Sequence, residues 1–151
     1  MRIEDVIKTN QQMEITTKTV INIAYTSRVI EMATSVFKDF NLTHQQYNVL
    51  RILRGQKGKP ANLSTLQERM IDRNSNTTRL VDKLVQKKLV SRKVCPENRR
   101  KIEILITEKG LTVLQDLDPI ITKANENAVK NLNTEELETL NNLLDKLRND
   151  E

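Results

Sequence analysis

The sequence has few of the residues that make large aromatic anchors or covalent links. Its 151 residues include no tryptophan, two tyrosines, two phenylalanines and one cysteine. A single cysteine excludes an internal disulfide framework and is typical of a reducing compartment. The core must therefore be built from leucine, isoleucine and valine. With three glycines, three prolines and no internal repeat, the chain is neither low-complexity nor a solenoid.

Long apolar segments are also missing. No run of apolar residues exceeds three, so the sequence predicts no transmembrane helix. The segment from Met1 to Asp5 lacks the apolar stretch that a signal peptide carries. We therefore expect a cytoplasmic protein without membrane association, and the length suits a single domain over residues 1–151.

The side chains that catalysis and metal binding require are scarce. His44 is the only histidine, which excludes a histidine-based zinc site and a Ser-His-Asp triad. The chain has no glycine-rich phosphate loop and no cysteine pair. We therefore expect no enzyme activity, no cofactor and no metal. Cys95 is interpreted as a strand-packing residue, with redox sensing as the less favoured alternative.

Charge is distributed unevenly along the chain. The net charge is +5, but the segment from Arg51 to Lys101 holds 15 Lys or Arg against four Asp or Glu. That segment therefore carries +11, and the remaining residues carry −6. A basic block between acidic arms indicates a module that binds a polyanion such as nucleic acid. A solvated, lysine-rich surface stays open as the alternative.

The spacing of apolar residues predicts a mainly α-helical fold. Apolar residues recur at helical intervals over residues 5–38, which predicts one long helix. Thr43 with Gln46 has the pattern of a capping box and predicts the start of a second helix. Ser64 with Gln67 has the same pattern and predicts the start of a third.

A helix-turn-helix and a β-hairpin follow. The polar residues 72–75 separate the third helix from a fourth that ends near Lys88, which predicts a helix-turn-helix. The apolar period then changes from helical to alternating over residues 89–94 and 102–106, which predicts a hairpin with a basic tip at 95–101. Thr107 and Thr134 are predicted to open the last two helices.

This order of elements is that of a winged helix with helical extensions at both ends. The stretch from Arg79 to Arg92 resembles the recognition helix and strand entry of the MarR (multiple antibiotic resistance regulator) family, with Lys88 in place of the usual glycine. The wing pattern of that family is similar at Arg100, Thr107 and Gly110. Asn98 stands in place of the aspartate of the pattern, which removes a carboxylate that would orient the neighbouring arginines.

The resemblance implies a sequence-specific regulator of transcription that binds double-stranded DNA. It implies a repressor that a small phenolic or other amphipathic effector releases from a pseudo-palindromic operator. Residues 5–38 and 108–151 would supply mainly the dimerisation helices of a homodimer, and 43–107 the winged helix-turn-helix. Half-sites for such a dimer lie about one DNA turn, roughly 34–36 Å, apart. An effector-independent DNA binder, or a helical interaction module with a basic face, stays open as the alternative.

The residue types at these positions suit DNA by their own chemistry. Asparagine and arginine make bidentate contacts with adenine and guanine, whereas lysine and arginine also bind phosphate. The candidate DNA-binding residues are Arg73, Ser75, Asn76, Thr78, Arg79, Lys83, Arg99, Arg100 and Lys101, and phosphate contacts are also expected from Lys87 and Lys88. The candidate effector-binding residues are Tyr25, Arg28, His44 and Tyr47, for which ordinary packing between helices is the alternative.

Overall fold

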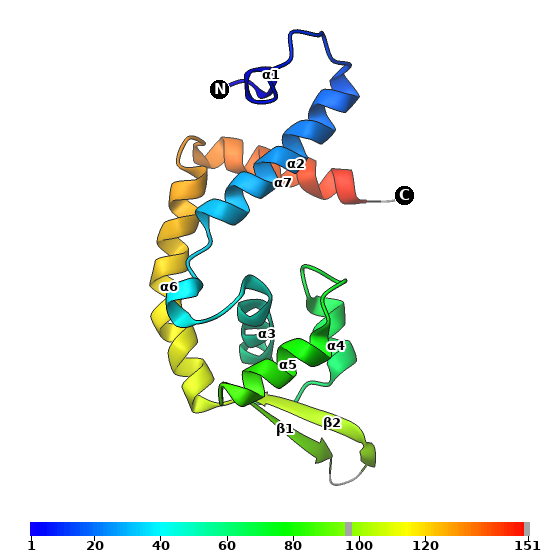
Figure 1. Cartoon of the computed structure of the whole chain (residues 1–151), viewed down its shortest axis with the longest axis vertical. Helices are drawn as coiled ribbons and strands as arrows, with labels where there is room; N and C mark the ends of the chain where they lie inside the picture. Colours follow the sequence, from blue (N-terminus) through cyan, green and yellow to red (C-terminus); the bar gives the residue numbers. More distant parts are fainter. Residues whose placement is uncertain (96–97, 150–151) are drawn as a thin grey trace. The chain divides into compact units, whose positions relative to one another are not determined.

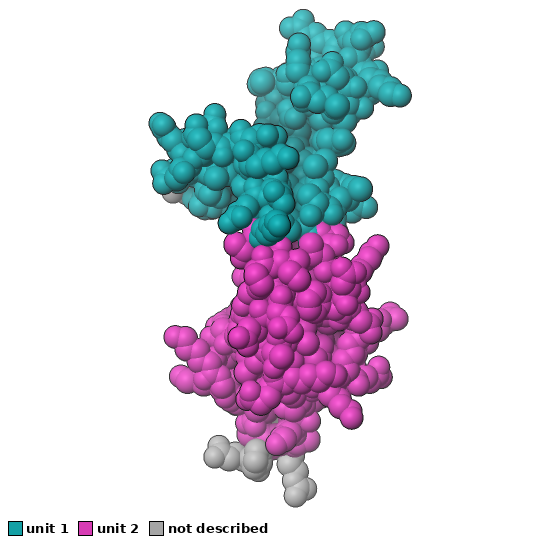
Figure 2. Space-filling model, turned by 90° about the vertical axis from the view of Figure 1, so that its left-hand side faces the viewer, with its two compact units in different colours: residues 1–34, 123–151 teal, residues 35–122 magenta. Residues whose placement is uncertain are grey.

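The chain folds as two compact units, coloured separately in Figure 2. The computed structural model describes residues 1–95 and 98–149. Unit 1 comprises Met1–Thr34 and Lys123–Glu151, and unit 2 comprises Ser35–Thr122. No helix in the described ranges is both long enough and apolar enough to cross a bilayer.

Unit 1 consists of helices only (Figure 1). Its elements are α1 (Ile3–Val6), α2 (Ile15–Ala33), the end of α6 (Glu108–Val129) and α7 (Thr134–Arg148). The predicted single helix over residues 5–38 is wrong, because residues 7–14 leave the helical path. Lys8 takes a left-handed φ of 54°, and the hydroxyl oxygen of Thr9 accepts a hydrogen bond from the backbone N–H of Gln11. Threonine and asparagine side chains compete in this way with helical backbone bonding.

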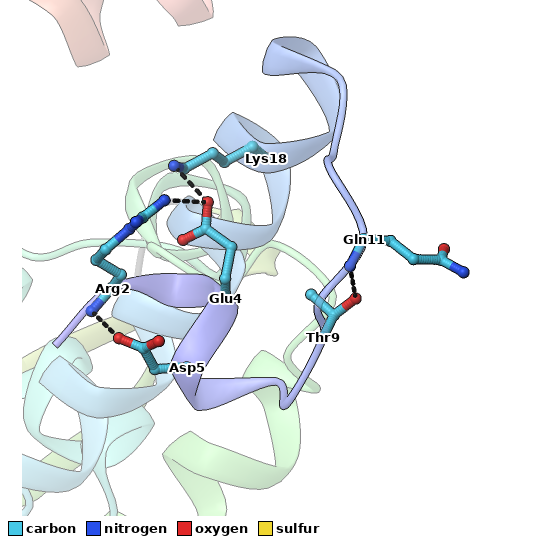
Figure 3. Close-up of polar contacts among 6 residues, drawn as sticks. All are labelled: Arg2, Glu4, Asp5, Thr9, Gln11 and Lys18. Atoms are coloured by element: carbon cyan, nitrogen blue, oxygen red, sulfur yellow. Dashed lines mark hydrogen bonds and ion pairs between the residues drawn. The ribbon is translucent and has the colours of Figure 1, made fainter.

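An ion pair ties the short helix α1 to α2 (Figure 3). The ammonium of Lys18 lies 2.6 Å from Glu4 Oε1, and the guanidinium of Arg2 lies 3.4 Å from the same atom. Hydrogen bonding from Lys18, with a backbone hydrogen bond as the next cause, lowers the pKa of the Glu4 carboxyl to about 2. The backbone N–H of Arg2 also donates to a carboxylate oxygen of Asp5 at 3.2 Å, at the start of α1. Polar contacts therefore hold the first turn of the chain.

Unit 2 contains the helix-turn-helix and the hairpin (Figure 1). Its elements are the 3₁₀ turn η1 (Lys38–Phe40), α3 (His44–Gly55), α4 (Leu63–Arg69), α5 (Thr77–Gln86), β1 (Val90–Cys95), β2 (Asn98–Ile106) and the start of α6. The predicted mainly α-helical, winged helix-turn-helix fold is confirmed. The capping box at Thr43 is confirmed as well, because its hydroxyl accepts from the N–H of Gln46 and the Gln46 side chain accepts from the N–H of Thr43.

Two predicted helix starts are displaced by one or two residues. Asn62, not Ser64, caps α4, and its Oδ1 accepts from the backbone N–H of Thr65 at 2.8 Å. Asn133, not Thr134, caps α7 through the N–H of Glu136. Asparagine and serine cap helices about equally well. Where two such residues lie close together, the sequence does not decide which of them is the cap, and the predicted helix start can differ by up to one turn.

Aliphatic side chains form the core of unit 2. The side chains with least exposure come from every element between α3 and α6, and they include Val49, Leu50, Leu66, Val81, Leu84, Ile104, Leu114 and Leu117. At the edge of this core, Arg54 of α3 makes a bidentate ion pair with Asp118 of α6, at 2.7 and 3.1 Å. The two helices of the helix-turn-helix therefore share one apolar core with α3, β2 and α6.

The hairpin is longer than the sequence predicted. β1 and β2 pair antiparallel from Val90 opposite Ile106 to Cys95 opposite Asn98, with a register shift after Val94. The predicted loop at 95–101 is therefore wrong for Cys95, which ends β1, and for residues 98–101, whose backbone lies in β2. Residues 96 and 97 of that loop lie outside the described residues. Residues typical of turns in this segment led to the prediction of a loop where the backbone pairs as a strand.

A close junction joins the end of the hairpin to α6. The hydroxyl of Thr107 donates to the carbonyl of Lys88 at 2.9 Å and accepts from the N–H of Gly110 at 3.1 Å. A Cβ atom on Gly110 would lie 2.3 Å from the backbone oxygen of Leu89 and 2.7 Å from Ile106 Cγ1. Glycine is therefore required at residue 110 because the helix backbone touches the backbone of the hairpin entry.

We predict that Gly110→Ala destabilises the protein by about 3 kcal/mol, at the upper end of the usual overpacking cost, because a backbone oxygen has little room to move. The free energy of unfolding from a urea titration measures this change. Gly55→Ala is the matched control, because a Cβ at Gly55 meets nothing within 4 Å. A similarly small effect of both substitutions would contradict the close approach at Gly110.

Candidate nucleic-acid interface

The turn between α4 and α5 is held by its own backbone and side chains. The carboxylate of Asp72 accepts from the N–H of Asn74 at 3.0 Å, and its carbonyl accepts from the N–H of Ser75 at 3.2 Å. Below the turn, Leu66, Val81 and Leu84 are fully buried and pack α4 against α5. The two helices therefore form a rigid pair that presents the start of α5.

The solvent face of α5 carries most of the predicted DNA-binding side chains. Asn76, Thr78, Arg79 and Lys83 are exposed, because Val81 and Leu84 take up the inner face. Arg73 is exposed in the turn, and Ser75 is half-buried. Within the described residues, Arg73, Arg79 and Lys83 form no ion pair with an acidic group. Their positive charges are therefore available to an anionic partner.

Asn76 has a structural role that the sequence analysis missed. It is the N-cap of α5, and its Oδ1 accepts from the backbone N–H of Arg79 at 3.0 Å. The amide nitrogen of Asn76 is left to donate, and Oδ1 keeps one lone pair. The sequence signal was available, since asparagine directly precedes the helical run that begins at Thr77.

Lys87 points into the protein and not only toward solvent. Its ammonium donates to the side chain of Gln46 at 3.0 Å and to the carbonyl of Asn41. Burial lowers the pKa of Lys87, and the nearby charge of Lys83 lowers it further. Lys87 therefore braces the end of α5 against the start of α3, a contact between residues more than 40 positions apart that periodicity does not reveal.

The end of α5 requires a left-handed residue. Lys88 has φ +62°, its N–H donates to Val85, and the N–H of Leu89 donates to Leu84. These two bonds form a Schellman motif, in which glycine is usual at the left-handed position. The exposed lysine at 88 therefore stands where the backbone favours glycine.

An ion pair connects the hairpin to α5. The guanidinium of Arg92 in β1 lies 2.7 Å from a carboxylate oxygen of Asp82 in α5. Both groups are partly exposed, so the pair contributes only about 0.2–1 kcal/mol to stability. It nevertheless sets the base of the wing against the helix. The sequence analysis assigned no role to either residue.

The predicted basic wing residues are placed by their backbone alone. Arg99, Arg100 and Lys101 belong to β2, in the part of the strand farthest from the core contact at Ile104. Their side chains lie outside the described part of the structure. Cys95 is half-buried at the end of β1, opposite Asn98.

The predicted effector residues fall in both units. Tyr25 and Arg28 are exposed on α2 in unit 1, where Arg28 pairs with Glu31 at 2.9 Å. His44 and Tyr47 are on α3 in unit 2. The ring of Phe37, which the sequence analysis did not select for this site, brings the latter two together, with centroid distances of 5.3 Å to His44 and 4.8 Å to Tyr47.

Comparison with known proteins decides the family. The model of the MarR family matches residues 42–102, which include the helix-turn-helix and most of the hairpin. The HTH-type transcriptional regulator MhqR of Bacillus subtilis (strain 168) is 31% identical over 103 residues, which cover 68% of this chain and 70% of MhqR. This chain belongs to the MarR family. It is therefore a DNA-binding transcriptional regulator.

Solved structures agree with this placement of the MarR-family chain. A MarR transcription factor from Planctomyces limnophilus is 29% identical, with a TM-score of 0.70 over 89% of this chain and 98% of its own. Bordetella bronchiseptica BpsR, whose DNA binding is regulated by 6-hydroxynicotinic acid, has a TM-score of 0.80 at 20% identity, over 93% of this chain and all of its own. The second likeness shows the shared fold alone.

The structure explains two residues of the family's wing pattern, Thr107 and Gly110. Thr107 caps α6 and bonds the end of α5, and Gly110 permits the contact with Leu89. Thr107 and Gly110 therefore hold the start of α6 against the end of α5 and the entry to the hairpin. At position 98 the family aspartate is absent, and the Asp82–Arg92 pair supplies an ionic contact at the other end of β1.

We predict that two substitutions of Asn76 separate its cap role from DNA contact. Asn76→Ala removes the capping oxygen and lowers the free energy of unfolding by about 1 kcal/mol. Asn76→Ser keeps a capping oxygen but loses the amide donor, so stability stays near the wild-type value while affinity for the preferred DNA site falls by roughly 1–3 kcal/mol. Urea unfolding and competition binding measure the two effects, and equal loss of stability in both variants would contradict the cap role.

Proposed function

We propose that this MarR-family regulator is a homodimeric repressor that a small aromatic effector releases from a pseudo-palindromic operator. The observation that carries the DNA part is the exposed face of the turn and of α5, where the cations Arg73, Arg79 and Lys83 have no acidic partner among the described residues. A helix N-terminus with short polar and cationic side chains fits the major groove.

The DNA-binding residues have three different roles: contact with base edges, contact with the sugar-phosphate backbone, and entry into the minor groove. Asn76, Thr78 and Arg79 contact base edges, because they lie on the first turn of α5. Ser75, Arg73 and Lys83 contact the sugar-phosphate backbone and set the register. Arg99, Arg100 and Lys101 reach the adjacent minor groove from the wing, where the negative potential of the DNA attracts arginine.

Unit 1 supports the dimer. Helices α2 and α7 bury none of their residues, although both carry apolar stripes. Their exposed apolar side chains include Ile15, Val20, Val29, Met32, Leu140, Leu143 and Leu147, several of them more than 60% exposed. Exposed apolar side chains in such number mark interaction surfaces, and a second copy would cover both helices by symmetry.

The aromatic cluster of unit 2 supports an effector of phenolic or related character. Phe37, His44 and Tyr47 stack, and the guanidinium of Arg51 lies 6.0 Å from the Tyr47 ring centre. Burial raises the pKa of the Tyr47 phenol, which therefore stays neutral and can donate a hydrogen bond. Phe37 and Tyr47 are buried in the core, whereas His44 and Arg51 are exposed, so an aromatic acid could stack on the His44 ring and pair with Arg51. Tyr25 and Arg28 stay candidate contacts on sequence grounds.

We predict a dimer at micromolar concentration that depends on the apolar face of α7. The double substitution Leu143→Asp with Leu147→Asp should produce monomers, because it places two charges on that face. Asn141→Asp with Asn142→Asp adds the same charge at exposed polar positions and should leave the dimer intact. Analytical ultracentrifugation measures the mass. A wild-type monomer at this concentration would rule out the two-fold operator proposal.

We predict that the recognition helix and the wing contribute differently to operator binding. Arg79→Ala should weaken the selected operator by roughly 1–3 kcal/mol and relax preference at particular base pairs. Arg100→Ala should weaken operator and scrambled duplexes evenly and reduce the salt slope by about one per subunit. The operator is first obtained by selection from random DNA, and Lys130→Ala in unit 1 is the control.

The salt dependence also separates this function from the alternatives. A dimer that contacts on the order of 6–10 phosphates loses about 10³–10⁵ in affinity between 50 and 200 mM salt. A flat dependence would favour a protein-interaction module with a basic face. Steep salt dependence without any preferred sequence would favour an architectural DNA binder.

A further inference from the structure

We propose that unit 2 has a separate pocket for an oxyanion of the phosphate or carboxylate type, formed where the start of α3 meets the end of α5. The pocket has a volume of 470 Å³ and is lined by Lys38, Asn41, Leu42, Thr43, Gln46, Lys83, Gln86 and Lys87. Pockets of this size hold small ligands. The pocket itself goes beyond the proposed function, and only its occupation by a DNA phosphate rests on that function.

The lining carries positive charge without a balancing carboxylate. Three of the eight lining residues, Lys38, Lys83 and Lys87, are lysines and none is acidic. None of these lysines forms an ion pair within the described ranges. The charge of Lys83 is close enough to Lys87 to disfavour the protonated form of the latter. Bringing like charges together in one pocket is unfavourable unless an anion neutralises them.

Hydrogen bonds in the wall use up acceptors and leave donors unpaired. Gln46 is 3% exposed, and its Oε1 already accepts from the N–H of Thr43 at 3.3 Å and from the ammonium of Lys87 at 3.0 Å. The amide nitrogen of Gln46 has no hydrogen-bond partner in the described part of the chain. Two of the wall acceptors, this Oε1 and the Asn41 carbonyl, accept from the Lys87 ammonium, which keeps a third N–H.

The local backbone adds to the preference for an anion. The pocket lies at the N-cap of α3, a helix of 12 residues, and the amino end of a helix carries partial positive charge. Lys38 on η1, Gln46 on α3 and Lys83 on α5 come from three elements that pack within unit 2. An oxyanion could therefore receive donors from three sides, an arrangement that single surface lysines do not provide.

Two sources could supply the oxyanion. Lys83 belongs both to this pocket and to the solvent face of α5, so a backbone phosphate of bound DNA could enter from that side. A free phosphate ester or carboxylate could instead occupy the pocket in the unbound protein. In that case the bound oxyanion would compete with the DNA for Lys83 and weaken operator binding. Both sources use the same chemistry.

The first experiment uses the intact protein without DNA and inorganic phosphate as the probe. The thermal midpoint is measured against phosphate concentration, with sodium chloride adjusted to hold the ionic strength constant. We expect a saturable rise in the midpoint. Lys38→Gln should raise the half-saturating phosphate concentration at least about five-fold, and Lys130→Gln, an exposed lysine of unit 1, should not change it.

The second experiment measures operator affinity against salt for wild type and Lys38→Gln. A reduction of the slope by about one per subunit assigns the pocket to a DNA phosphate. An unchanged slope together with a phosphate effect on the thermal midpoint assigns it to a free oxyanion. If Lys38→Gln matches wild type in both the phosphate response and the salt slope, the pocket does not bind oxyanions and the proposal is wrong. If the protein binds no operator at all, the proposed function is wrong, and the phosphate titration still tests the pocket because it uses no DNA.

Discussion

One backbone contact fixes the DNA-binding module, and it lies at Leu89. The N–H of Leu89 closes the end of α5, and its carbonyl accepts from the N–H of Thr107, just before α6 begins. The same carbonyl limits residue 110 to glycine. A single peptide segment therefore positions the recognition helix, the first wing strand and the connecting helix α6.

Much of unit 2 could be predicted because its determinants are local. The capping box at Thr43, the inner face of α5 and the change of period after Lys88 each depend on residues a few positions apart. The same holds for the solvent face of α5, since Val81 and Leu84 take up its inner side.

The misses share a different physical origin. Residues 7–14 leave the helix although no glycine or proline interrupts them, because side chains such as Thr9 satisfy the backbone in another way. The inward turn of Lys87 and the pair of Asp82 with Arg92 join residues that are distant in sequence or on different elements. Periodicity reports which side of an element is apolar. It does not report which polar side chain of one element meets which of another.

Lys88 adds a positive charge at a position where its backbone conformation lowers stability. A residue other than glycine in the left-handed region costs about 1 kcal/mol, and the exposed side chain makes no hydrogen bond in the described residues that would offset it. The lysine does add a positive charge directly after the recognition helix, where glycine would add none. Proteins that must bind a ligand commonly keep residues that a purely stability-based choice would replace. Position 88 is therefore one where greater stability and greater positive charge call for different residues.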